Sequence, residues 1–117
     1  MVTRGSVVVV AVSGDYGKPR PAVVVQNARS AALIDSLTLC LMTSDLSNAS
    51  RLRITVEPDA TNGLRRVSQV QADKVQTVPK TKVGRVIGTL SPAHMEALDL
   101  ALAFHLSLYA PVPPEET

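Results

Sequence analysis

Two valine-rich segments separated by a short polar loop constrain the fold of this chain more than any other feature. Residues 5–13 and 21–26 have the length and β-branched composition of strands, and the loop between them carries glycine and proline. Such a pair is typical of an antiparallel hairpin. The apolar run at residues 7–12 is too short to span a membrane and lacks the pattern of a signal peptide. We therefore expect a β-rich, cytoplasmic protein that opens with a hairpin and has no membrane association.

The remainder of the chain continues the pattern of short strands. Residues 51–57 alternate strictly, with Leu52, Ile54 and Val56 on one face and polar residues on the other, which predicts a half-buried antiparallel strand. Aromatic residues make up only 3% of the sequence, so the core must consist of aliphatic side chains. Further strand signals, separated by turn residues, lie at 31–42, 67–71, 74–78 and 82–90.

The chain ends in a predicted helix. Ser91 is a suitable N-cap with proline following it, and the segment should continue to about Leu108. Apolar residues recur at helical spacing along it, namely Met95, Leu98, Leu102 and His105 or Leu106. We expect one domain over residues 1–110, a flexible tail rich in proline and glutamate at 111–117, and structural roles for both histidines.

Charge is unevenly distributed along the sequence. Residues 1–90 contain all 12 Lys and Arg and six of the 10 Asp and Glu, whereas residues 91–117 contain four acidic residues and no basic one. A basic body favours a polyanionic partner. Cys40 lies in an apolar run, which favours a buried structural thiol. No cluster of Cys, His and Asp has the spacing of a metal site, so we expect no metal and no cofactor.

Arg20 occupies an unusual position between Pro19 and Pro21, at the start of the second valine-rich segment. The two prolines restrict the backbone, so the guanidinium is presented from a stiff corner at low entropic cost. Such a corner suits a phosphate or a carboxylate, although an arginine in a hairpin loop can equally be a solvated surface charge.

The order of several sequence blocks resembles the MazF/PemK family of toxin endoribonucleases over nearly the whole chain. The resemblance implies a mostly β (α+β) fold, an SH3-like β-barrel of about six to seven strands with a C-terminal α-helix, working as a homodimer. The blocks are Arg4-Gly5, residues 20–27 (Arg-Pro-Ala-Val-Val-Val-Gln-Asn), Thr43-Ser44, residues 71–78 (Gln-Ala-Asp-Lys-Val-Gln-Thr-Val) and residues 86–91 leading into the helix.

In that family the arginine of the Arg-Pro corner and a threonine at the end of the third strand carry the chemistry, which the resemblance places at Arg20 and Thr43. Attack of a ribose 2′-hydroxyl on the adjacent phosphorus needs alignment, charge neutralisation and a proton for the leaving oxygen. An arginine stays charged at physiological pH, so electrostatic stabilisation is the first role of Arg20. The Thr43 hydroxyl would orient the scissile phosphate, or would simply cap the turn that follows it.

Further residues are candidates for RNA contact, each with a plain surface role as the alternative. Asp73 matches a carboxylate that some members place in the RNA site, and Tyr16 is the one aromatic residue near Arg20 in the sequence. Gln71 stands where one branch of the family has an arginine, and the same branch's loop histidine is absent, so the general base is unassigned. The remaining candidates are Lys18, Ser44, Arg65 and Lys74, with Arg53 and Arg66 as additional phosphate-positioning cations.

The leading hypothesis is a toxin that cleaves single-stranded RNA sequence-selectively and without a metal, and that is neutralised by an antitoxin whose acidic tail covers the basic groove. An alternative uses the same barrel as a protein-binding inhibitor, as the gyrase-poisoning CcdB toxins do. A third reading is an inactive member that only binds nucleic acid.

Overall fold

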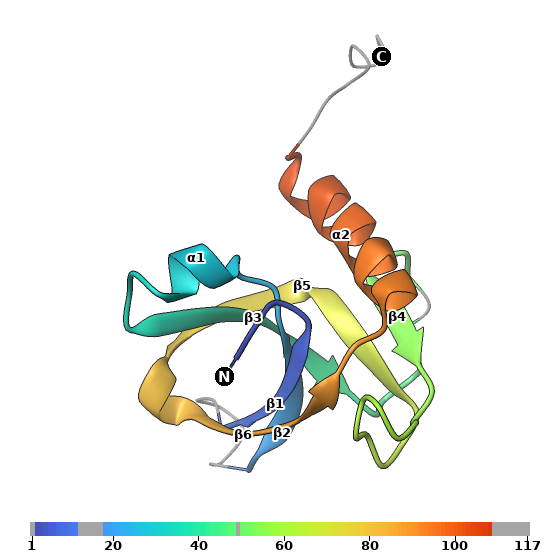
Figure 1. Ribbon diagram of the computed structural model, residues 1–117. Coiled ribbons are helices and arrows are strands. Elements are labelled where there is room, and N and C mark those ends of the chain that lie inside the picture. Colours follow the sequence, from blue (N-terminus) through green and yellow to red (C-terminus); the bar gives the residue numbers. More distant parts are fainter. Residues whose placement is uncertain (1, 12–17, 49, 109–117) are drawn as a thin grey trace, which may run out of the picture.

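The computed structural model describes residues 2–11, 18–48 and 50–108. Six strands form one antiparallel sheet in the order β4-β5-β3-β2-β1-β6, and a helix leaves it at the C-terminal end (Figure 1). The strands are β1 (Ser6–Val10), β2 (Arg20–Val24), β3 (Ser36–Thr43), β4 (Arg53–Val56), β5 (Ser68–Pro79) and β6 (Val83–Thr89). The helices are α1 (Ala28–Ala31), the 3-10 turn η1 (Lys80–Lys82) and α2 (Pro92–Leu106).

The loop after β4 joins the two edges of the sheet. Among the described strands β4 and β6 are the edges and do not pair, but Thr89 donates its backbone N–H to the Thr61 carbonyl at 2.9 Å. Two glycines permit this approach: a Cβ on Gly63 would lie 2.0 Å from the Ile87 carbonyl oxygen, and one on Gly88 would lie 2.4 Å from that of Thr61. The expected mostly β fold of about six to seven strands with a terminal helix is confirmed: the described sheet has six strands. Strand pairing does not close it into a barrel, because β4 and β6 stay unpaired and only the loop after β4 contacts β6.

Apolar side chains are buried on both faces of the central strands. Along β1, Val7 belongs to the cluster beneath α2, whereas Val8 and Val10 belong to a second cluster inside the curl of the sheet. A strand buried on both faces reads as a continuous apolar run rather than an alternating one. This explains the valine run in the sequence, while β4, with Ile54 and Val56 buried and Thr55 exposed, alternates as predicted.

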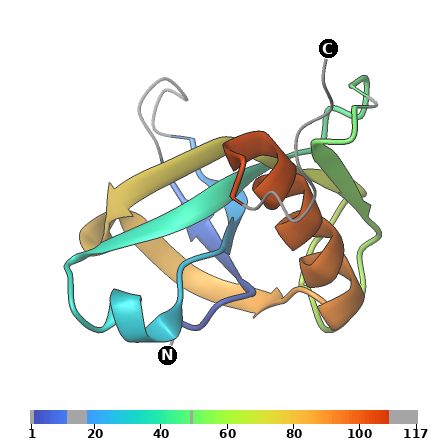
Figure 2. The same ribbon diagram turned by 90° about the horizontal axis from the view of Figure 1, so that it is seen from above.

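Helix α2 covers β4 and β5 on one face of the sheet (Figure 2). Its N-cap prediction is confirmed, because the Ser91 hydroxyl accepts the His94 backbone N–H at 3.1 Å. The helix ends where Ser107 adopts a left-handed conformation with φ of 54°. The residues it buries are Leu98, Ala101 and Leu102, whereas His105, expected on or near this stripe, is exposed.

The prediction of one strand-like run from residue 31 to 42 was wrong over residues 31–35. Residues 28–31 form α1, which Asn27 caps by accepting the Arg29 backbone N–H on Oδ1 at 2.7 Å. The strand begins only at Ser36, and Leu33 is 83% exposed. The apolar side chains at 33 and 34 belong to the connection, where capping determines the conformation.

The two short strands predicted at 67–71 and 74–78 are a single strand, β5. The register with β3 shifts between Cys40 and Met42, so an irregularity interrupts the pairing without ending the strand. No glycine or proline lies between residues 68 and 78, which is why the strand continues. The predicted break after Pro79 is confirmed as the turn η1.

Candidate active site

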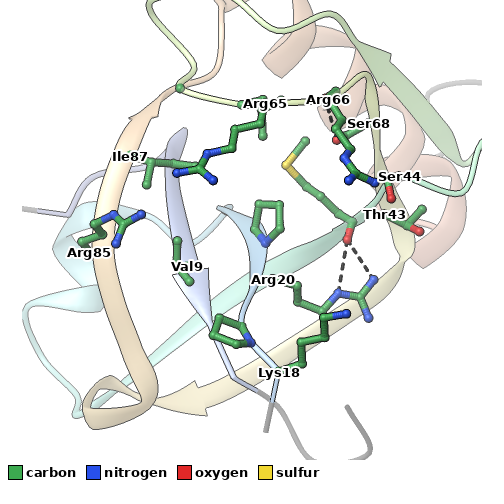
Figure 3. Close-up of a pocket in the computed structure, with 15 residues that line it drawn as sticks. Val9, Lys18, Arg20, Thr43, Ser44, Arg65, Arg66, Ser68, Arg85 and Ile87 are labelled. Atoms are coloured by element: carbon green, nitrogen blue, oxygen red, sulfur yellow. Dashed lines mark hydrogen bonds between the residues drawn. The ribbon is translucent and has the colours of Figure 1, made fainter. Parts of the chain in front are cut away.

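A cavity of about 770 Å³ lies at one end of the sheet (Figure 3). Its lining comes from β1, β2, β3, β5 and β6 and from the loop before β5. Thr43, Ser44 and Ser68 supply hydroxyl groups to it. Five cationic residues line it, namely Lys18, Arg20, Arg65, Arg66 and Arg85.

Arg20 is held against the end of β3. Its Nε and Nη2 donate to the Met42 carbonyl oxygen at 3.2 and 2.8 Å, and Nη2 also lies 3.4 Å from Oε1 of Gln71. These contacts orient the guanidinium against the end of β3. Because Ala22 pairs with Leu41, continuing the register two residues along each strand places Arg20 beside Thr43. The predicted juxtaposition of these two residues is therefore present in the structure.

Thr43 is the last residue of β3 and faces the cavity. Its Oγ1 accepts the backbone N–H of Asp45 at 3.1 Å, and the Asp45 carboxylate accepts that of Ser47 at 3.0 Å, so the turn predicted at this point is built from side-chain caps. Capping uses the hydroxyl oxygen as an acceptor, and the hydroxyl hydrogen can still be donated to an anion. The capping and functional readings of Thr43 are thus compatible.

The sequence analysis named four of the five cations that line this cavity and did not name Arg85. Lys18, Ser44 and Arg65 were predicted RNA contacts, and all three line it together with Arg66. Arg85 was not singled out, because its position depends on how β6 pairs with β1 rather than on a motif.

Two glutamines lie next to this cavity on β5. Gln71, a predicted RNA contact, contacts Arg20 as described and is 7% exposed. Gln69 was not predicted. It pairs with Thr43 across the strands and donates Nε2 to the Asn48 carbonyl at 3.0 Å, while its buried Oε1 has no hydrogen-bond partner among the described residues.

Asp73 and Lys74 do not line the cavity. Asp73 accepts from Arg53 in a two-point ion pair, with Nε–Oδ1 and Nη2–Oδ2 distances of 3.0 and 3.2 Å. Partial burial alone would raise the pKa of the Asp73 carboxyl, but the hydrogen bonds and charge of Arg53, helped by Lys74, outweigh it and hold the pKa below its ordinary value. Tyr16 lies outside the described residues.

Cys40 is the remaining reactive side chain considered in the sequence analysis, and it is buried in the core. Burial, reinforced by the Asp73 charge, raises the pKa of the Cys40 thiol to about 12, which confirms a core role. Within residues 2–11, 18–48 and 50–108, no group of three or more His, Cys, Asp and Glu side chains could hold a metal ion. None of the helices in the described residues is long and apolar enough to cross a bilayer.

The curled antiparallel sheet, the terminal helix and the cationic cavity define a small β protein with a site suited to a polyanion. The family of PemK-like, MazF-like toxins of type II toxin-antitoxin systems matches residues 3–106. This chain belongs to that family.

Relatives and solved structures agree with the family match. The chain is 37% identical over 106 residues to the probable endoribonuclease MazF of Mycolicibacterium smegmatis, covering 90% of this chain and 96% of the relative. It is 31% identical over 96 residues to endoribonuclease MazF9 of Mycobacterium tuberculosis, covering 78% and 80%. Its fold matches that of an endoribonuclease in complex with its cognate antitoxin from a mycobacterial species, with a TM-score of 0.81 at 22% identity over 95% of this chain and 100% of that one.

Proposed function

We propose that this chain is a toxin endoribonuclease that cleaves single-stranded RNA sequence-selectively and without a metal ion. The observation that carries the proposal is the placement of Arg20 beside Thr43 in one cationic cavity. The named relatives, two of them endoribonucleases at 31% and 37% identity, support it. The cations of the cavity would also serve nucleic-acid binding without cleavage, so the cleavage assay below decides between these two functions. No feature of the described residues points to gyrase inhibition.

The reaction is an internal transesterification. The ribose O2′ forms a bond to the adjacent phosphorus while the bond from phosphorus to O5′ breaks, which leaves a 2′,3′-cyclic phosphate and a 5′-hydroxyl. The 2′-hydroxyl loses one proton and the leaving oxygen gains one, so no water is consumed. Arg20 stabilises the negative charge that grows on the phosphorane oxygens, and the Thr43 hydroxyl donates to a non-bridging oxygen and fixes the phosphate in line.

Two partner proposals accompany this function. Solved relatives include MazE-MazF complexes from Deinococcus radiodurans, and an acidic antitoxin segment would be attracted to the five cations of the cavity. A homodimer is supported by the apolar residues that α2 leaves exposed, since patches of this kind are typical of protein interfaces. These residues are Leu100, Phe104 and Leu106, and Leu108 just beyond the helix is exposed as well. A cytoplasmic location accords with an RNA substrate.

Incubation of the purified protein with a long RNA in EDTA tests the enzymatic proposal. We expect discrete fragments with cyclic phosphate ends from the wild type and from Arg29→Ala, which removes an exposed arginine of α1 outside the cavity. Arg20→Ala should produce none. Cleavage by Arg20→Ala would refute the assigned role of Arg20, a requirement for added metal would refute metal independence, and gyrase inhibition without cleavage would favour the CcdB-like alternative.

A further inference from the structure

The wall of the cavity opposite Arg20 is also cationic. In Figure 3, Arg65 and Arg85 lie on the side of β6 and β1, whereas Arg20 and Lys18 lie on the side of β2 and β3. Arg66 lies on the Ser44 side of the loop. The cavity therefore has two cationic walls rather than one cluster of charge around the proposed scissile position.

Arg85 owes its position to an irregularity in the sheet. Val8 pairs with Val86 and Val10 pairs with Val83, so that Gly84 and Arg85 together lie opposite Val9 alone. Two residues opposite one is a β-bulge, a feature that re-aims a side chain and that is common beside functional sites. The Gly84 position is close enough to β1 that a Cβ there would lie 3.1 Å from the Val9 carbonyl oxygen.

Nothing in the described part of the chain compensates the charge of this wall. The ion pairs found there are Arg4–Asp99 and Arg53–Asp73, and the side chains of Arg65 and Arg85 are exposed and take part in no ion pair or hydrogen bond among the described residues. Exposed arginines held near each other repel, which costs stability unless an anion binds between them. The arrangement is the one expected of a site for an anionic ligand.

The apolar side chains of Val9, Pro21, Leu64 and Ile87 also line the cavity, and we refer to them as its floor. Such a floor offers no polar groups to a phosphate but can accept the face of a nucleobase. A strand that crosses it would have a base over the floor and phosphates at both walls.

We propose that Arg85, with Arg65, forms a second phosphate subsite that binds a backbone phosphate of the RNA distinct from the one being cleaved. This subsite rests on the proposed ribonuclease function, since it extends the same cavity. Arg85 and Arg65 are positioning residues: they hold the strand across the floor so that the scissile phosphate lies against Arg20, and they take no part in bond making. Their contribution is to affinity and salt dependence and carries no sequence preference.

Binding of a 2′-O-methylated, uncleavable 12-nucleotide RNA of mixed sequence, measured by fluorescence anisotropy across a salt series, tests the subsite. For single strands the slope of log K against log salt is about −0.7 per phosphate neutralised, so Arg85→Gln should make the slope less steep by about that amount. Arg85→Lys should restore the wild-type slope, because binding at this position depends on the positive charge and not on the bidentate geometry of a guanidinium. Arg29→Gln, the matched control on α1, should leave the slope unchanged.

Cleavage kinetics provide the second readout. Arg85→Gln and Arg65→Gln should raise KM several-fold with kcat within about twofold of the wild type, because the subsite acts in binding and not in the chemical step. Thermal unfolding of each variant separates this effect from a folding defect.

An unchanged salt slope in Arg85→Gln would overturn the subsite, as would a wild type that does not bind the RNA. Arg85→Gln or Arg65→Gln variants that lose affinity for poly-glutamate but keep it for RNA would also overturn it, because they would assign this wall to an acidic protein segment. A wild type that binds with the predicted salt slopes but never cleaves would refute the nuclease and leave the subsite standing. If the wild type cleaves RNA and neither Arg85→Gln nor Arg65→Gln changes KM, the nuclease function would stand and the subsite would be refuted.

Discussion

The placement of Arg20 and Thr43 at the rim of the sheet could be predicted from the residues that flank each of them in the sequence. The prolines around Arg20 predicted a rigid corner, and the turn residues after Thr43 predicted the end of a strand, so both residues could be placed at a rim. Arg85 could not be found in the same way, because its placement follows from a bulge that only the pairing of β6 with β1 reveals. The ion pair of Asp73 with Arg53 was equally hidden, since it joins residues that are 20 positions apart.

Replacing Thr43 tests its two hydrogen-bonding roles by two measurements, kcat for the hydrogen bond to the phosphate and the unfolding free energy for the cap on Asp45. Thr43→Val keeps the shape of the side chain but removes the hydroxyl, so kcat should fall by about 10²-fold, the usual effect of losing one donor to a developing oxyanion. Loss of the Asp45 cap should also cost about 1 kcal/mol of unfolding free energy. Thr43→Ser keeps the hydroxyl and should retain most of the activity. Full activity in Thr43→Val, measured on the same RNA, would reduce Thr43 to a turn cap.

The Arg53–Asp73 pair predicts a pH dependence of stability. The folded pKa of Asp73 lies below its ordinary value, so the stabilisation is complete above the unfolded pKa of about 3.9 and is lost as the pH falls through the folded pKa. Asp73→Asn should lower the unfolding free energy by about 1–3 kcal/mol at pH 7 and by less at pH 2, as measured in urea. Asp35→Asn, which removes a carboxylate outside any ion pair of the described residues, is the control. An equal loss at both pH values would contradict the charge-based account.

At the scale of elements, strands buried on one face were easier to predict than the connections between them. The alternation in β4 survives in the structure because one side of that strand faces solvent. The strand prediction was wrong for residues 31–35, because Leu33 and Ile34 look like strand residues although the Asn27 cap and a turn determine the backbone there. The irregularity inside β5 likewise depends on pairing with β3 and has no local signature.

Leu98 and Leu100 of α2 should respond differently to replacement by alanine, because only Leu98 is buried. Leu98 is fully buried against the sheet, so Leu98→Ala should cost about 2–5 kcal/mol of unfolding free energy. Leu100 is 59% exposed, and Leu100→Ala should change the stability of the monomer by less than about 0.5 kcal/mol. Chemical denaturation at low protein concentration compares them. Similar losses in both variants would mean that the orientation of α2 is wrong.

The glycine contact between the loop and β6 should be the least substitutable part of the sheet. Gly88→Ala would place a Cβ 2.4 Å from backbone atoms of the loop, so it should cost more than about 2 kcal/mol. Gly84→Ala, on the same strand, meets one backbone oxygen at 3.1 Å and should cost less. Thermal unfolding ranks the two, and an equal or reversed ranking would show that the loop does not close against β6 as described.

On the scale of the whole molecule, α2 has an apolar side facing the sheet and another facing solvent. Phe104 is 59% exposed, and the Arg51 guanidinium lies 4.7 Å from the centre of its ring. An apolar strip with a cation at its margin fits the proposed interface between two copies of the chain better than it fits a solvated helix. The sequence predicted the helix but not its exposed apolar side. Helical periodicity identifies the apolar positions, but it does not tell which of them pack on the sheet and which a partner would cover.

Phe104→Glu tests that interface. A carboxylate in an apolar contact between two copies costs several kcal/mol, so sedimentation should show a shift from dimer to monomer at micromolar concentration. Leu33→Glu, an exposed leucine outside α2, should leave the sedimentation unchanged. A dimer that persists in Phe104→Glu would place the interface elsewhere, and a dimer lost only in Leu33→Glu would place it at the connection after α1.

The lining of the cavity runs from Val9 to Ile87, so almost the whole sheet must be assembled before the cavity exists. A nascent chain acquires its last wall only when β6 has left the ribosomal exit tunnel and the glycine contact has formed. Translation that stops before the end of β6 at Thr89 should therefore release no active fragment.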